Sequence, residues 1–141
     1  MGKKKLDLEI EVEASVVGIV SSLKDYKLAW KINQVFKIEL VLDEDLVIDL
    51  TKGNSLTLSN YCYQTDFVKI NLVKNKGINK EKAVYLAKEL PQIDYFLLIE
   101  GEDQFMEMAE IIQQLQSINE ISFVQLIDMT KLKSRDNFIF Y

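Results

Sequence analysis

The stretch that most constrains the fold covers residues 89–100 and reads ELPQIDYFLLIE. It holds the only proline of the chain, Pro91, then the acid-aromatic pair Asp94 and Tyr95, and then an uninterrupted apolar run that ends before a glycine. A short continuous apolar run between such breaks is typical of a strand buried on both faces. We therefore expect residues 93–99 to form the central strand of the fold.

Other periodic patterns predict the remaining elements. Apolar residues at helical spacing predict two amphipathic helices. The first covers residues 23–36, and the second is opened by Glu102 and Asp103 and ends near residues 117–119. Ser22 and Asp25 resemble a capping box for the first helix, and Tyr26 and Trp30, four residues apart on its flank, are expected to pack at the edge of the core. Further strands are predicted over residues 6–12, 16–20, 38–42, 46–50, 56–63, 67–73 and 121–127.

The connections between these elements indicate the fold class. Residues 43–45 (DED) are predicted to form an acidic hairpin turn, residues 75–82 (NKGINKEK) a mobile loop, and residues 83–90 a short helical turn that ends before Pro91. Two strand–helix–strand units, over residues 16–42 and 93–127, are separated by hairpins. This order predicts an α+β fold of two layers with a ferredoxin-like flavour. The sheet is expected to be largely antiparallel with about six to eight strands, and to carry both helices on one face.

The length and composition exclude several classes of protein. With 141 residues, the chain is expected to form a single domain, 1–141. It contains no histidine, which removes triad hydrolases and most zinc sites. The only cysteine, Cys62, is interpreted as a small apolar filler rather than a reactive thiol. The five glycines are too widely spaced for a phosphate-binding loop, and the DED cluster lacks the spacing of a calcium site. We expect no catalytic residue, metal or cofactor.

Charge and hydropathy indicate partners and location. The formal net charge of −5 argues against nucleic-acid binding, which needs clustered lysine and arginine. The apolar runs are too short to cross a bilayer. An acidic residue at every second position from Asp7 to Glu13 leaves no apolar segment for an export signal. We therefore expect a cytoplasmic protein that binds neither nucleic acid nor membrane.

Four segments together carry a family resemblance: residues 18–30 (GIVSSLKDYKLAW), 89–95 (ELPQIDY), 94–97 (DYFL) and 132–140 (LKSRDNFIF). On these segments the chain resembles the IPExxxVDY family, small proteins of Bacteroidetes-type bacteria with no assigned function. The signature falls on residues 87–95, where Glu89, Asp94 and Tyr95 agree, Ile93 stands for valine, and Ala-Lys replaces Ile-Pro at its start. The resemblance implies a single-domain bacterial protein and supplies no reaction.

The sequence predicts a non-catalytic interaction or scaffold domain that forms a homodimer or binds an unidentified protein partner. Glu89, Ile93, Asp94 and Tyr95 are interpreted as structural residues, since polar groups at the start of a strand commonly satisfy local backbone groups. Two alternatives remain open. One is a small-molecule-binding regulatory domain, by analogy of fold alone. The other is an enzyme that uses Asp25, Glu89 or Asp94 with Tyr95, which requires acids that converge in one pocket.

Overall fold

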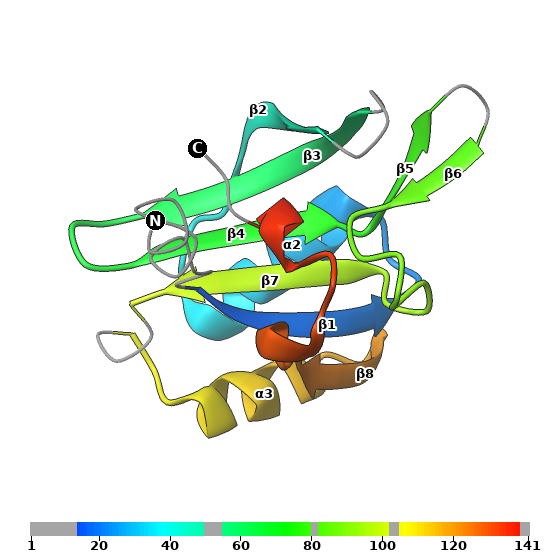
Figure 1. Cartoon of the computed structure of the whole chain (residues 1–141). Helices are drawn as coiled ribbons and strands as arrows, with labels where there is room; N and C mark the ends of the chain where they lie inside the picture. Colours follow the sequence, from blue (N-terminus) through cyan, green and yellow to red (C-terminus); the bar gives the residue numbers. More distant parts are fainter. Residues whose placement is uncertain (1–13, 50–54, 80–81, 102–104, 139–141) are drawn as a thin grey trace, which may run out of the picture.

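A computed structural model describes residues 14–49, 55–79, 82–101 and 105–138 of the chain (Figure 1). The predicted strand over residues 6–12 lies outside these ranges. The elements, in chain order, are β1 (Ser15–Ser21), α2 (Asp25–Phe36), β2 (Val41–Asp49), β3 (Ser55–Gln64), β4 (Lys69–Lys74), β5 (Lys76–Asn79), β6 (Lys82–Tyr85), β7 (Tyr95–Glu100), α3 (Met108–Gln116), β8 (Ile121–Leu126) and the 3₁₀ turns η3 (Met129–Lys131) and η4 (Arg135–Phe138).

The described strands form two sheets. Six of them form one sheet in the order β2-β3-β4-β7-β1-β8, in which every neighbouring pair is antiparallel, while β5 and β6 form a separate hairpin. The predicted α+β class, with two helices and a largely antiparallel sheet, is confirmed. The prediction of a central strand is also confirmed: β7 lies between β4 and β1, and its first five residues are buried.

The helices join strands that are parallel but not adjacent. Strands β7 and β8 both run antiparallel to β1, so they are parallel to each other with β1 inserted between them. Helix α3 connects these two strands in a split strand–helix–strand unit. Strands β1 and β2 are also parallel, but three strands separate them. Each predicted strand–helix–strand unit is therefore present as a chain segment, but in neither unit are the two strands hydrogen-bonded to each other.

A hydrophobic core lies on each face of the sheet. On one face α2 and α3 pack Leu28, Ile32, Ile111 and Leu115 onto the strands. On the other face Phe96 packs edge-on against Phe138 with ring centroids 5.0 Å apart. Figure 1 shows the C-terminal turns, in orange to red, on the side of the sheet opposite α2. The sequence predicted the layer of helices on one face. It did not predict that the C-terminal turns pack on the other face.

Strand β2 corrects the predicted acidic hairpin. Residues 41–49 form one strand, paired with β3 throughout, and the acidic residues lie in a bulge rather than in a turn. Between the pairs Asp43–Asn60 and Leu46–Leu58, β2 advances three residues while β3 advances two, so one extra residue is accommodated. The acids interrupt the apolar pattern of β2 without reversing the chain.

Two other local predictions are wrong. The described parts of residues 75–85 form the β5–β6 hairpin, so residues 83–85 are strand rather than helix. Helix α2 has Lys24 as its N-cap, without a side-chain cap, so Ser22 does not close a capping box. The residues before α2 are held instead by contacts from β7.

Candidate functional site

Asp94 connects the starts and ends of three neighbouring strands. Its carboxylate accepts a hydrogen bond of 2.9 Å from the Ser21 amide at the end of β1. Its own amide donates to the Ile19 carbonyl at 3.0 Å, and its carbonyl accepts from the Asn75 amide, just after β4, at 3.0 Å. The side chain and both main-chain groups of Asp94 are therefore engaged in holding the sheet.

Tyr95 points into the helix-covered core. Its side chain is 3% exposed, and its hydroxyl donates to the Leu23 carbonyl at 2.5 Å. Burial raises the pKa of this phenol to about 12, and the nearby charges of Asp25 and Asp94 and the hydroxyl of Tyr61 act in the same direction. A general base or nucleophile of this kind needs a lowered pKa. Tyr95 keeps its proton at neutral pH and serves as a buried donor.

Glu89 lies on the side of the sheet opposite the helices, next to the C-terminal turns. Its carboxylate accepts hydrogen bonds from the amides of Lys133 at 2.7 Å and Ser134 at 3.0 Å, so it ties the segment before β7 to the C-terminal turns. Partial burial acts to raise the pKa of Glu89, but the hydrogen bonds it accepts outweigh that effect and lower the pKa. The Ser134 hydroxyl is close enough to contribute to this lowering, but it makes no well-aligned hydrogen bond; the two amides do.

Ile93 completes the signature as a purely apolar contact. Its side chain is 1% exposed and belongs to the same core as Phe96. A Cβ on Gly18 of β1 would come within 3.1 Å of its Cδ1 atom, so the absence of a side chain at Gly18 lets Ile93 approach the sheet. Three of the four signature residues therefore make polar contacts with main-chain groups, and the fourth fills a core.

The acids named for carboxylate catalysis do not converge. Asp25 and Asp94 both act on the pKa of Tyr95, whereas Glu89 is bonded to the C-terminal turns that cover the other face. Asp94 is already bound by the Ser21 amide. Catalysis by paired carboxylates needs two acids that share one pocket, and these three do not share one.

Asn75 is the polar residue that the sequence reading missed. It lies in the stretch predicted to be a mobile loop, yet it is fully buried. Its side-chain amide donates to the carbonyls of Leu90 at 2.8 Å and Ile93 at 2.9 Å, and its side-chain oxygen accepts from the Ala87 amide at 2.9 Å. Asn75 thereby shapes the turn that places Asp94 and Tyr95. Nothing in its polar sequence context distinguishes it from a solvated loop asparagine.

Cys62 occupies a half-buried position on β3. Burial raises the pKa of its thiol, and the opposing influence of Lys69 and of the Asn71 side chain does not reverse that shift. The thiolate is the reactive form of cysteine. The direction of the shift therefore agrees with an inert side chain rather than a nucleophile.

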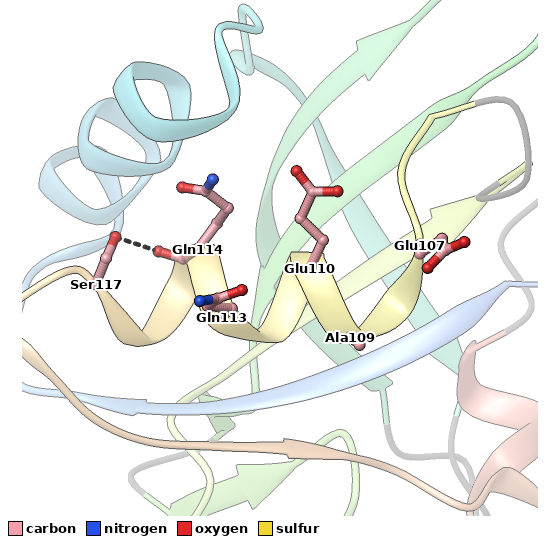
Figure 2. A pocket seen from close by; sticks show the side chains of 6 residues that line it. All are labelled: Glu107, Ala109, Glu110, Gln113, Gln114 and Ser117. Atoms are coloured by element: carbon pink, nitrogen blue, oxygen red, sulfur yellow. Dashed lines mark hydrogen bonds between the residues drawn. The ribbon is translucent and has the colours of Figure 1, made fainter.

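A shallow depression follows α3, as Figure 2 shows. All of its lining residues belong to this helix and its two ends: Glu107, Ala109, Glu110, Gln113, Gln114 and Ser117. A single helix provides no opposing wall, and the one hydrogen bond drawn there joins the Ser117 hydroxyl to the Gln114 carbonyl at 2.6 Å. No group of metal-ligating side chains occurs among the described residues. The depression brings together no set of groups for catalysis.

An exposed apolar surface lies beside α2. The register places Leu42 and Val47 of β2 on the same face as Tyr61 of β3, which packs at the edge of the helix-covered core. Leu42 and Val47 are each 64% exposed. Within the described structure, the packed helices thus leave this outer part of the sheet uncovered.

Helix α2 adds two aromatic side chains to that surface. Trp30 is 58% exposed and Tyr26 54% exposed, so the prediction that they pack at the core edge is wrong. Tyr26 affects the pKa of Tyr61, and Asn33, on the same side of α2 as Tyr26 and Trp30, bonds both main-chain groups of Leu40 just before β2. This side of α2 therefore faces β2 and β3. We call Tyr26, Trp30, Leu42, Val47 and Tyr61 the aromatic shelf.

A scan against models of protein families finds no match, and a search of curated proteins finds none either. None of the described helices has the length and apolar character needed to span a membrane.

Proposed function

We propose that this chain is a non-catalytic interaction domain that binds a protein partner through the aromatic shelf. The observation that carries the proposal is the exposure of Trp30, Tyr26, Leu42 and Val47 on one side of the molecule. Aromatic residues are the side chains most enriched where proteins bind one another. Scattered apolar residues are normal on a surface, so we propose in addition that these four side chains form one contiguous patch, the arrangement that marks a binding site.

The signature residues support a structural rather than a catalytic role. The side chains of Glu89, Asp94 and Tyr95 each form hydrogen bonds with main-chain groups of other segments. We propose that these contacts are the reason for the family signature, and that the chain is a divergent member of the IPExxxVDY family acting in the cytoplasm. The alternative of a small-molecule-binding domain gains no support from the depression on α3, which is open and formed by one helix.

The test compares two variants that each replace one exposed aromatic side chain by serine. Trp30→Ser removes an aromatic side chain from the shelf, whereas Phe67→Ser removes one that is 72% exposed on the β3–β4 turn. A cellular protein captured by the wild type should be purified and its affinity measured. We expect Trp30→Ser to weaken that affinity about tenfold or more, as for an interface hot spot, and Phe67→Ser to leave it unchanged. Equal effects of the two variants on the affinity would overturn the proposal. So would a captured protein that does not bind the wild type when both are purified.

A further inference from the structure

The two edges of the six-stranded sheet differ in how they are protected. Edge strand β2 carries a bulge and the exposed acids Asp43, Glu44 and Asp45, which are devices that prevent pairing with another sheet. Edge strand β8 reads ISFVQL, with no charge, no proline and no glycine. Among the described residues, no strand pairs with its outer side.

The register shows which main-chain groups face that outer side. The Ile127 amide donates to the Val16 carbonyl of β1 at 2.9 Å. Because inward and outward main-chain groups alternate along an antiparallel strand, the groups of Gln125 and Phe123 also point to β1. The amide and carbonyl groups of Val124 and Leu126 therefore point away from the sheet, in position to form a further ladder; Ser122 lies at the irregularity beside Val20 and Ser21, where this alternation ends.

The side chains of β8 are suited to a symmetric contact. Phe123 is 51% exposed and Leu126 48% exposed, on opposite faces of the strand. Antiparallel pairing of two copies about a two-fold axis at Val124 sets Phe123 of each copy opposite Gln125 of the other. No like charges face each other in that register, and each Phe123 gains a cross-strand neighbour that covers it.

We propose that two copies of this chain pair through β8 and extend the sheet across a two-fold axis. A second copy fits this edge because antiparallel pairing makes β8 complementary to itself, and an isologous contact closes at two copies. Of the two edges that the described strands form, the acidic bulge of β2 leaves β8 as the one open to pairing. This inference rests on β8 alone and does not depend on the aromatic shelf.

The test follows mass and amide exchange on the full chain as its concentration is raised. We expect a monomer–dimer equilibrium by sedimentation, in which the amides of Val124 and Leu126 become protected as the dimer forms. The double variant Phe123→Lys with Gln125→Lys places lysines opposite each other on both sides of the axis and should weaken dimerisation about tenfold or more.

Matched controls keep the result interpretable. Val41→Lys puts the same charge at an exposed position of the guarded edge strand and should leave the dimer unchanged, while urea denaturation of the double variant reports any loss of folding stability. A monomer at all concentrations up to about 1 mM would overturn the proposal. So would outer β8 amides that are already protected in the monomer, because a segment of the same chain would then cover the edge.

Discussion

The hydroxyl of Tyr95 donates a hydrogen bond of 2.5 Å to the main-chain carbonyl of Leu23, 72 residues earlier in the chain. The neighbouring carboxylate of Asp94 accepts from the amide of Ser21. Two consecutive residues at the start of β7 thus hold both ends of the short link between β1 and α2. These contacts fix the chain just before α2, which has no side-chain cap of its own.

Replacing Tyr95 by phenylalanine should destabilise the fold in a pH-dependent way. At neutral pH Tyr95→Phe leaves the Leu23 carbonyl unpaired and should lower the free energy of unfolding by about 1–2 kcal/mol. The pKa of Tyr95 is raised from 10.0 to about 12. Its contribution is therefore fully present below pH 10 and is lost as the pH rises through about 12.

Two pKa units correspond to about 2–3 kcal/mol. Denaturant titrations from about pH 8 to pH 12 should therefore show a steeper loss of stability for the wild type than for Tyr95→Phe. Tyr26→Phe, at an exposed position of α2, is the matched control and should follow the wild-type slope. Parallel curves for Tyr95→Phe and the wild type would contradict this assignment.

Replacing Asn75 by leucine should be among the most damaging single substitutions. The change leaves two carbonyls and one amide without their partners in a fully buried site. Each unsatisfied buried group costs about 1–3 kcal/mol, so we expect a loss of about 3 kcal/mol or more in the free energy of unfolding. Thermal and urea denaturation measure it. Asn119→Leu, at an exposed position before β8, should change stability by about 0.5 kcal/mol or less.

Replacing Glu89 by glutamine should loosen the C-terminal turns. The charged hydrogen bonds to the Lys133 and Ser134 amides weaken in Glu89→Gln, with an expected loss of about 1 kcal/mol at neutral pH for this exposed group. The pKa of Glu89 is lowered from 4.5. The stability it contributes is therefore present above pH 4.5 and is lost as the pH falls through the folded-state pKa.

The measurement for Glu89 combines pH and location. Melting temperatures of the wild type and Glu89→Gln should converge as the pH is lowered below 4.5, since both side chains are then neutral. Amide exchange at Lys133 and Ser134 should be faster in the variant at neutral pH. A constant difference in melting temperature at every pH would assign the effect to packing instead.

Replacing Gly101 by alanine should strain the end of β7. Gly101 has a φ of +80°, and a Cβ at this position would overlap the carbonyl oxygen of Phe67 in the β3–β4 turn. We expect Gly101→Ala to lower the free energy of unfolding by about 2 kcal/mol or more, and to speed amide exchange in that turn. The adjacent exposed position serves as a control, since Glu100→Ala adds no such overlap.

The successful predictions came from patterns of apolar residues that are typical of only one type of secondary structure. The run from Tyr95 to Ile99 can bury both sides only as a central strand, and β7 is that strand. Alternation over residues 56–63 and 67–73 predicted the β3–β4 hairpin, and helical spacing predicted α2 and α3. Each of these patterns lies within a single segment, so it can be recognised without knowing which other elements pack against that segment.

The patterns that failed depended on what lies opposite. The DED run of β2 resembles a turn when its sequence is considered alone. In the structure β2 pairs with β3 on both sides of this run, so the run forms a bulge within one strand. Tyr26 and Trp30 resemble core-edge residues, but both are more than half exposed because no described element packs over that side of α2. Asn75 resembles a loop residue, but the carbonyls of Leu90 and Ile93 converge on it.

The sequence by itself determined the class of the fold, the identity of its central strand and the absence of histidine-based chemistry. These properties follow from composition and local period, which the chain carries residue by residue. Only the tertiary structure decided which main-chain groups Glu89, Asp94 and Tyr95 bind, and that β8 lies at an edge of the sheet that the described strands form. Hydrogen-bond partners dozens of residues away set those roles, and a sequence pattern contains no record of which distant groups will meet.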